Sequence, residues 1–150
     1  MGDGMKRRPL LPLLGSLAAL LAAGLLLWSR AGTRPFRDLT AGDARPFQKL
    51  TAWDIQSVKL ELYPPDVEFT LTREEIEELA PLLNGVVVYQ RDDSYREYDG
   101  QACLFTLTLA DGSRITVEAY NPFLIVDGVG RRCEYGPCEA LSHFANTLRD

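Results

Sequence analysis

The sequence predicts an α+β domain that follows a single N-terminal transmembrane helix. Three observations predict it: a charge-free apolar run over residues 10–28, short alternating segments between residues 58 and 126, and helical periodicity over residues 72–84 and 137–148. Strands that come in runs, with helices set apart from them, favour a mainly antiparallel sheet with two packed helices. The length of 150 residues suits one such domain.

The apolar run, residues 10–28, is the first element, and as an α-helix it would reach about 28 Å, close to the thickness of a bilayer core. Lys6 to Arg8 precede it, so the basic residues 1–9 are expected in the cytoplasm and the remainder outside. This predicts a single-pass signal-anchor in the cell membrane. The alternative is a cleaved signal peptide, with small residues for cleavage at 29–31, although the run exceeds the usual length of such a segment.

Residues 29–52 are predicted to be a juxtamembrane linker that contains a duplication. Two stretches, RPFRDLTAGD and RPFQKLTAWD, match with a period of 11 residues. The second copy leads straight into a strand, so we expect Phe47, Leu50 and Trp53 to pack on the domain and the first copy to be looser. The duplication is interpreted as a spacer, with a docking motif for a membrane partner as the alternative.

The extracytoplasmic domain, residues 53–150, begins with a predicted hairpin. Apolar residues alternate over residues 58–62 and 67–71, which is the period of a strand with one buried face. Residues 63–66 between them contain two prolines, which lack the N–H that a strand ladder needs. They are therefore expected to form the turn.

The first predicted helix spans residues 72–84. Thr72 and Glu75 have the spacing of a capping box, and Asn84-Gly85 is a typical end. Pro81 weakens the prediction for the last turn, because proline removes a helical hydrogen bond. The apolar face of this helix would be formed by Ile76, Leu79, Leu82 and Leu83.

Further strands and a closing helix complete the domain. The helix, residues 137–148, places Leu141, Phe144, Ala145 and Leu148 on one face. Segments rich in β-branched, leucine and aromatic side chains predict strands at 86–89, 102–109, 114–119 and 123–126, with a short edge strand around 132–135.

Charge and motifs narrow the function classes. Residues 32–150 hold 12 Lys/Arg against 20 Asp/Glu, a net charge of −8, which argues against nucleic acid and anionic lipid as partners. The sequence has no Gly-rich phosphate loop, nucleophile elbow or His–carboxylate pair at useful spacing. No cofactor and no enzymatic activity are therefore expected.

The cysteines Cys133 and Cys138 are predicted to fasten the last helix to the sheet, as a disulfide or as buried thiols. A zinc site is disfavoured, because three cysteines and one histidine lack the usual paired spacing and Cys103 lies within a strand. His143 stands five positions after Cys138, so on a helix the two point to different sides, and we expect His143 at the surface. A thioredoxin-type pair has two intervening residues rather than four, yet it remains the alternative enzymatic function.

The loop at residues 91–100 is the strongest candidate for a binding surface. It is longer than most hairpin loops and carries Tyr95, Tyr98, Arg91 and Arg96, which suit recognition because tyrosine offers a large contact area. Its acids lack the spacing of a calcium loop. The alternative is a solvated loop whose tyrosines fold back on the sheet. Residues of the neighbouring turns extend the candidate surface: Asn121, Phe123 and Asp127.

About 100 residues of the chain resemble a group of small, uncharacterised membrane-anchored or secreted proteins of Gram-positive, clostridia-like bacteria. The resemblance is strongest in Asn121-Pro122-Phe123, in residues 127–130 and in Pro137-Cys138-Glu139-Ala140-Leu141. In similar proteins a tyrosine often stands where this chain has Arg131. The resemblance implies location and fold, not chemistry. The sequence thus predicts a membrane-tethered extracytoplasmic binding or accessory module, with an envelope protein or peptide as its partner.

Overall fold

The structure is a computed structural model, and it describes residues 44–149. The predicted anchor at residues 10–28 and the first copy of the duplication lie outside the described residues. Within residues 44–149, no helix is both long and apolar enough to cross a membrane.

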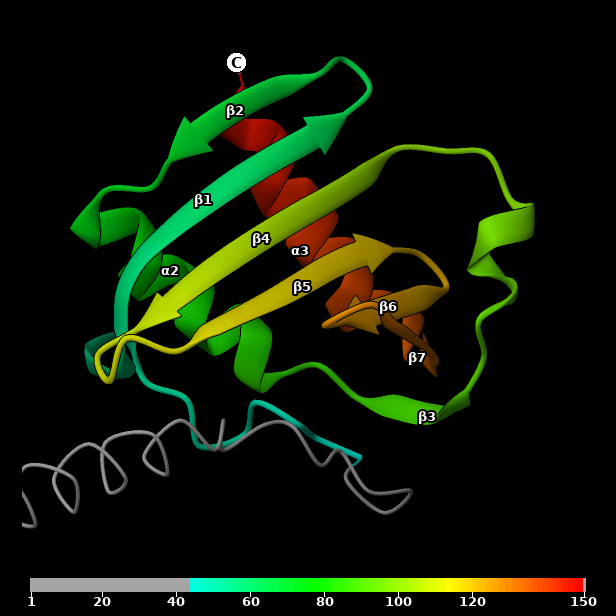
Figure 1. Ribbon diagram of the computed structural model, residues 1–150, viewed down its shortest axis with the longest axis horizontal. Coiled ribbons are helices and arrows are strands. Elements are labelled where there is room, and N and C mark those ends of the chain that lie inside the picture. Colours follow the sequence, from blue (N-terminus) through cyan, green and yellow to red (C-terminus); the bar gives the residue numbers. More distant parts are fainter. Residues whose placement is uncertain (1–43, 150) are drawn as a thin grey trace, which may run out of the picture. The chain divides into compact units, whose positions relative to one another are not determined.

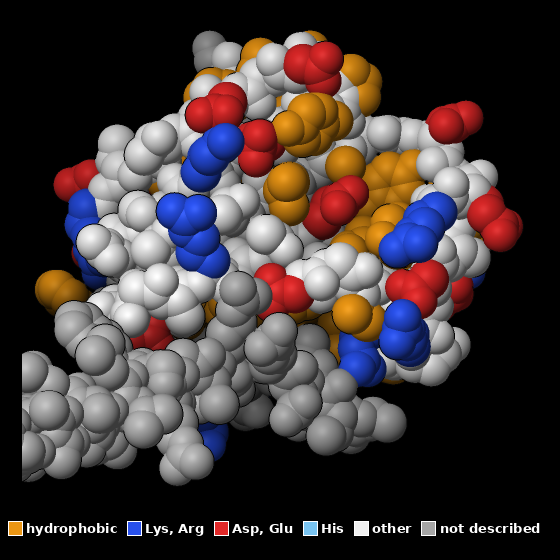
Figure 2. Space-filling model, in the orientation of Figure 1, with side chains coloured by type: hydrophobic (Ala, Val, Ile, Leu, Met, Phe, Trp, Pro, Cys, Tyr) orange, Lys and Arg blue, Asp and Glu red, His pale blue; other side chains and the backbone are white. Residues whose placement is uncertain are grey.

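The described residues fold as one seven-stranded sheet with two helices on one face (Figure 1). All six strand pairings are antiparallel, in the order β2-β1-β4-β5-β6-β7-β3. The predicted α+β class with an antiparallel sheet and two helices is confirmed. Figure 2 views the opposite, helix-free face, where hydrophobic side chains and charges of both signs are interspersed. The elements are η1 (Ala52–Asp54), β1 (Ile55–Tyr63), β2 (Val67–Thr70), α2 (Arg73–Asn84), β3 (Val88–Arg91), η2 (Ser94–Glu97), β4 (Ala102–Leu109), β5 (Arg114–Tyr120), β6 (Phe123–Val126), β7 (Val129–Cys133) and α3 (Tyr135–Thr147).

The main core lies between the sheet and the helices. Alternate residues of β1, β4 and β5 are buried, as their period of two predicts. Phe105 of β4 stacks on Phe144 of α3, with ring centroids 6.5 Å apart. Each fully buried side chain of this size stabilises the fold by about 1.5–3 kcal/mol through removal of apolar area from water.

Helix α2 begins with the predicted capping box. The Thr72 hydroxyl accepts from the backbone N–H of Glu75, and the Glu75 carboxylate accepts from the backbone N–H of Thr72 at 2.6 Å. Pro81 does not end the helix, which continues to Asn84. The buried Leu79 and Leu83 on either side of Pro81 hold this turn against the core.

The second copy of the duplication belongs to the domain, although its first residues fall in the stretch assigned to the linker. Phe47 and Leu50 are buried, as expected, and the Asn84 side chain donates to both of their carbonyls at 2.7 Å. The expectation for Trp53 is wrong, because its side chain is 81% exposed. In the 3₁₀ turn η1, residues three apart share a face. Ala52 and Ile55 take the inward positions, so Trp53 points outward, under the guanidinium of Arg73.

Two further expectations are corrected at the end of the chain. The strand expected around residues 132–135 is β7, Val129–Cys133, and it is an interior strand between β6 and the edge strand β3. The tight turn that pairs Val126 with Val129 starts β7 directly after Gly128. Helix α3 begins at Tyr135 rather than at Pro137. Pro137 fits inside the first turn, where its missing N–H has no helical partner in any case.

Candidate functional site

The predicted loop at residues 91–100 starts with the last residue of β3, continues almost to β4, and covers β6 from the side opposite the main core. Leu124 and Val126 belong to the main core, whereas Phe123 is fully buried outside it. The tyrosines of the loop cover the Phe123 ring: ring centroids are 5.5 Å apart for Tyr98 and 6.3 Å apart for Tyr95. Strand β6 is thus buried on both faces.

The loop packs directly against the backbone of Gly130 in β7. Its N–H donates to the Asp93 carboxylate at 2.9 Å, and its carbonyl accepts from the N–H of Asp92 at 2.9 Å. A Cβ atom at Gly130 would lie 2.5 Å from the Asp92 carbonyl oxygen and 2.6 Å from the Tyr95 ring. Tyr95 is therefore a half-buried support of the loop, as in the alternative interpretation in which the tyrosines fold back.

Arg132 fixes the loop from the neighbouring strand. Its Nε donates to Asp92 at 2.7 Å, and its guanidinium lies 4.4 Å from the centroid of the Phe123 ring. Hydrogen bonds from Ser94 and from Arg132 lower the pKa of Asp92 to about 2. The charge of Arg132 is thus neutralised by a carboxylate that stays ionised at neutral pH.

A cavity of about 410 Å³ opens beside this loop. Its walls come from three segments that are distant in the sequence: the end of the loop, the turn between β5 and β6, and α3. Three predicted binding residues, Tyr98, Asn121 and Phe123, lie together in it. The complete lining is Tyr98, Asp99, Gly100, Gln101, Tyr120, Asn121, Phe123, Glu139, Ser142, His143 and Asn146.

Hydrogen bonds join the three walls. The Asn121 amide donates to the carboxylate of Glu139 at 3.1 Å, which links the β5–β6 turn to α3. The Asn146 amide donates to Gln101 at 2.9 Å and links α3 to the loop. The Tyr120 hydroxyl donates to the Tyr98 carbonyl at 2.7 Å. The cavity is held open by a network that includes its own lining residues.

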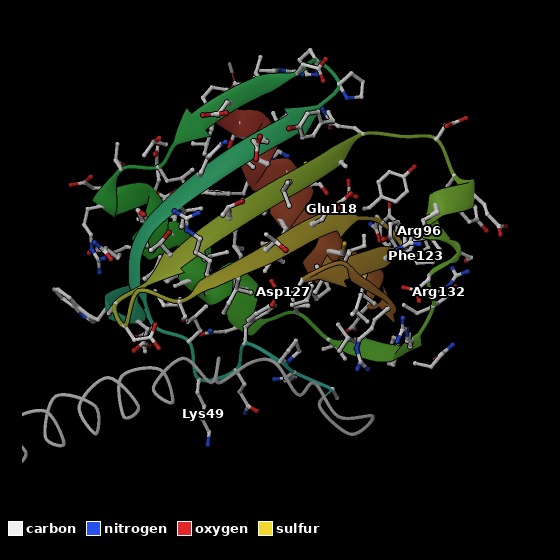
Figure 3. All side chains as sticks on the ribbon, in the orientation of Figure 1. Lys49, Arg96, Glu118, Phe123, Asp127 and Arg132 are labelled. Atoms are coloured by element: carbon white, nitrogen blue, oxygen red, sulfur yellow. The ribbon has the colours of Figure 1, made fainter. Side chains whose placement is uncertain are left out.

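The other predicted binding residues lie outside this cavity. Arg91 pairs with Asp93 at 2.8 Å, and Arg96 stacks over Tyr95 at 5.5 Å, both on the outer surface of the loop. Asp127 has a φ of 48° in the β6–β7 turn, and its carboxylate accepts from the Thr116 N–H at 3.0 Å. In Figure 3, Arg96 and Phe123 lie together at one end, whereas Asp127 lies apart from them. The role of Asp127 in this structure is to shape a hairpin.

The cysteine pair joins β7 to α3 as buried free thiols, and Cys103 is also a buried free thiol. The Cys138 thiol donates to the Phe123 carbonyl at 3.4 Å. A hydrogen bond between Cys133 and Cys138 lowers the pKa of Cys133 and, together with burial, raises that of Cys138. Among residues 44–149, no cluster of three His, Cys, Asp or Glu side chains could hold a metal ion. The pair fastens helix to sheet as expected, and the disulfide itself stays a prediction.

Most polar residues of the cavity were not predicted from the sequence. Glu139, Ser142, His143 and Asn146 have the spacing i, i+3, i+4, i+7, which puts them on one face of α3. The same spacing identified the apolar face of this helix. This polar stripe lies opposite the predicted apolar stripe, as on any surface helix, so the spacing could have shown that the four side chains share a face but not that a cavity lies beside them.

Comparisons of the chain with protein-family models, with curated proteins and with solved structures gave no significant match in any of the three. What the cavity can do therefore has to follow from its own geometry and chemistry.

Proposed function

We propose that the chain is a membrane-tethered, extracytoplasmic binding or accessory module, and that the cavity beside Tyr98 receives part of an envelope protein or peptide. One observation carries the proposal: three distant segments meet around a cavity that contains three of the binding residues predicted from the sequence. Its volume falls within the range of about 300–1,000 Å³ that is usual for ligand sites.

The charge-free run at residues 10–28, behind Lys6 to Arg8, supports tethering with the domain outside the cytoplasm. The acidic balance of the domain supports a partner other than nucleic acid. The exposed ring of Tyr98, 54% accessible at the rim of the cavity, supports contact with a macromolecular partner.

The alternative function, thiol–disulfide exchange by Cys133 and Cys138, finds less support. Exchange requires a thiolate that a second molecule can reach. Cys138 is fully buried and Cys133 is 7% exposed. Neither residue lines the cavity. Burial of both sulfurs favours a structural pair over a catalytic one.

A crosslinking pull-down from whole cells tests the proposal. Tyr98→Ala should abolish capture of envelope partners, because it removes the aromatic rim of the cavity and with it a contact of about 1–2 kcal/mol or more. Tyr89→Ala is the matched control, since Tyr89 is similarly exposed, at 51%, on the edge strand β3 and does not line the cavity. Thermal melts of both variants check that each is folded. Equal capture by wild type and Tyr98→Ala would show that the binding surface lies elsewhere.

A further inference from the structure

The side-chain donors around the cavity are mostly engaged within the protein. Both N–H groups of the Asn121 amide are used, by the Tyr135 carbonyl and by Glu139. Both N–H groups of the Asn146 amide are used as well, by Ser142 and Gln101. These two amides, the most prominent donors in the lining, can offer a ligand no hydrogen without losing a bond.

The smaller donors are engaged in the same way. The Tyr120 hydroxyl donates to the Tyr98 carbonyl, the Gln101 amide to the Pro64 carbonyl at 2.9 Å, and the Ser142 hydroxyl to a carbonyl of its own helix. The side-chain donors that remain are the Tyr98 hydroxyl, His143 and the second N–H of Gln101. A ligand rich in acceptors, such as a carboxylate or phosphate, would find little to hold it.

Acceptors and negative charge, in contrast, remain available. The carboxylates of Asp99 and Glu139 both line the cavity. Asn121 uses one oxygen of Glu139 at 3.1 Å, and an ionised carboxylate has about four acceptor sites in all, so acceptor capacity is left over. Among the described residues, no Lys or Arg lines the cavity, and Arg132, which contacts Phe123, is paired with Asp92.

The aromatic walls favour the same sign of charge. Tyr98 and Tyr120 both line the cavity, and the electron-rich faces of such rings attract ammonium and guanidinium groups. Gly100 lies directly beside the Tyr120 ring. A Cβ atom at this position would lie 3.2 Å from the Tyr120 hydroxyl oxygen, so the absence of a side chain leaves room next to the ring. An acidic domain also raises the encounter rate with cationic partners.

We infer that the cavity takes a cationic side chain, lysine or arginine, presented by a peptide segment of the partner. This inference rests on the proposed function and specifies its ligand chemistry. The cation would donate to Glu139 and Asp99 and lie against the tyrosine rings. Two features give specificity for a cation. Most side-chain donors are already hydrogen-bonded within the protein, so an anion would find few partners, and the carboxylates of Asp99 and Glu139 would pair with a positive charge.

A titration of the full-length chain in detergent, followed by NMR shifts of the side-chain amides of Asn121, Asn146 and Gln101, tests the inference. Four capped amino acids serve as probes: N-acetyl amides of lysine, arginine, glutamine and glutamate. The lysine or arginine probe should bind and shift these amides, and the glutamine and glutamate probes should not. The comparison of lysine with arginine distinguishes an ammonium from a guanidinium ligand.

Glu139→Gln should weaken binding of the cationic probe at least about tenfold, because it replaces a charge-assisted hydrogen bond with a neutral one. The substitution keeps the side-chain size and an acceptor for Asn121. Glu74→Gln, on the exposed start of α2, is the matched control and should leave the affinity unchanged.

Three results would overturn the inference: tighter binding of glutamine or glutamate than of the cations, an unchanged affinity in Glu139→Gln, or no binding of any probe. The first two would leave the cavity as a ligand site and so leave the proposed function standing. After the third, Tyr98-dependent capture in the pull-down would still support the proposed function. Loss of that dependence would remove both.

Discussion

Among single residues, Glu118 is a carboxylate in the second half of the central strand β5 (Figure 3), and it faces away from the helices because its neighbours Val117 and Ala119 face the core. Its cross-strand neighbours are Leu104 on β4 and Ile125 on β6. Among residues 44–149, no hydrogen bond or ion pair joins its carboxylate. Burial therefore raises the pKa of Glu118 without a compensating partner.

A raised pKa in the folded state means that the ionised carboxylate opposes folding at neutral pH. Stability should rise as the pH falls through the folded-state pKa, and the effect should be complete below the unfolded value of about 4.3. Glu118→Gln should therefore raise the melting temperature at pH 7 and leave it close to wild type below pH 4.

Melting curves of Glu118→Gln at both pH values check this prediction, with the exposed Glu97→Gln as the control. A lower melting temperature at pH 7 for Glu118→Gln would show instead that the carboxylate has a stabilising partner.

Among the helices and strands, the sequence predicted correctly those features that depend only on residues close together in the chain. The capping box at Thr72, the alternation in β4 and the apolar face of α3 depend on residues close in sequence. Strand β7 was misplaced because its sequence, VGRRC, contains two adjacent arginines and therefore lacks the alternation of apolar and polar residues that identifies a strand. Arg132 is stabilised in this strand by its hydrogen bond to Asp92 and its contact with the Phe123 ring, and both partners come from other parts of the chain. The cavity shares this origin, since its walls meet only in the folded chain.

Gly130 is the point at which the loop at residues 91–100 depends on β7. Gly130→Ala should push the loop away from β7 and cost about 1–3 kcal/mol, because the added Cβ would overlap backbone and ring atoms. Denaturant unfolding measures the loss, and an increase in Tyr98 accessibility to solvent reports the displacement.

Gly136→Ala is the matched control, since a Cβ there meets nothing within 4 Å, and it should change stability by less than about 0.5 kcal/mol. Equal stabilities of the two alanine variants would mean that the loop can move without cost, and that the cavity has no fixed wall on this side.

For the molecule as a whole, the folded domain begins before residue 53, the start predicted from the sequence. Phe47 and Leu50 are core residues, so the end of the predicted linker, residues 47–52, belongs to the folded domain. The duplication predicted that Phe47 and Leu50 would pack, because the second copy runs into β1. The sequence could not predict the orientation of Trp53, which depends on the helical form of the turn η1.

The proposed topology places residues 1–9 in the cytoplasm and the domain outside, and labelling of an introduced cysteine can test it. Gly32→Cys should react with a membrane-impermeant maleimide in whole cells, because positive charge before an apolar run favours an N-terminus in the cytoplasm. The native cysteines give this experiment a low background, since Cys103, Cys133 and Cys138 are all buried thiols. The wild-type chain, treated in parallel, measures that background directly. Labelling that appears only after permeabilisation would reverse the topology. An N-terminus at residue 32 on the purified wild-type chain would instead identify the apolar run as a cleaved signal peptide and leave the domain without a tether.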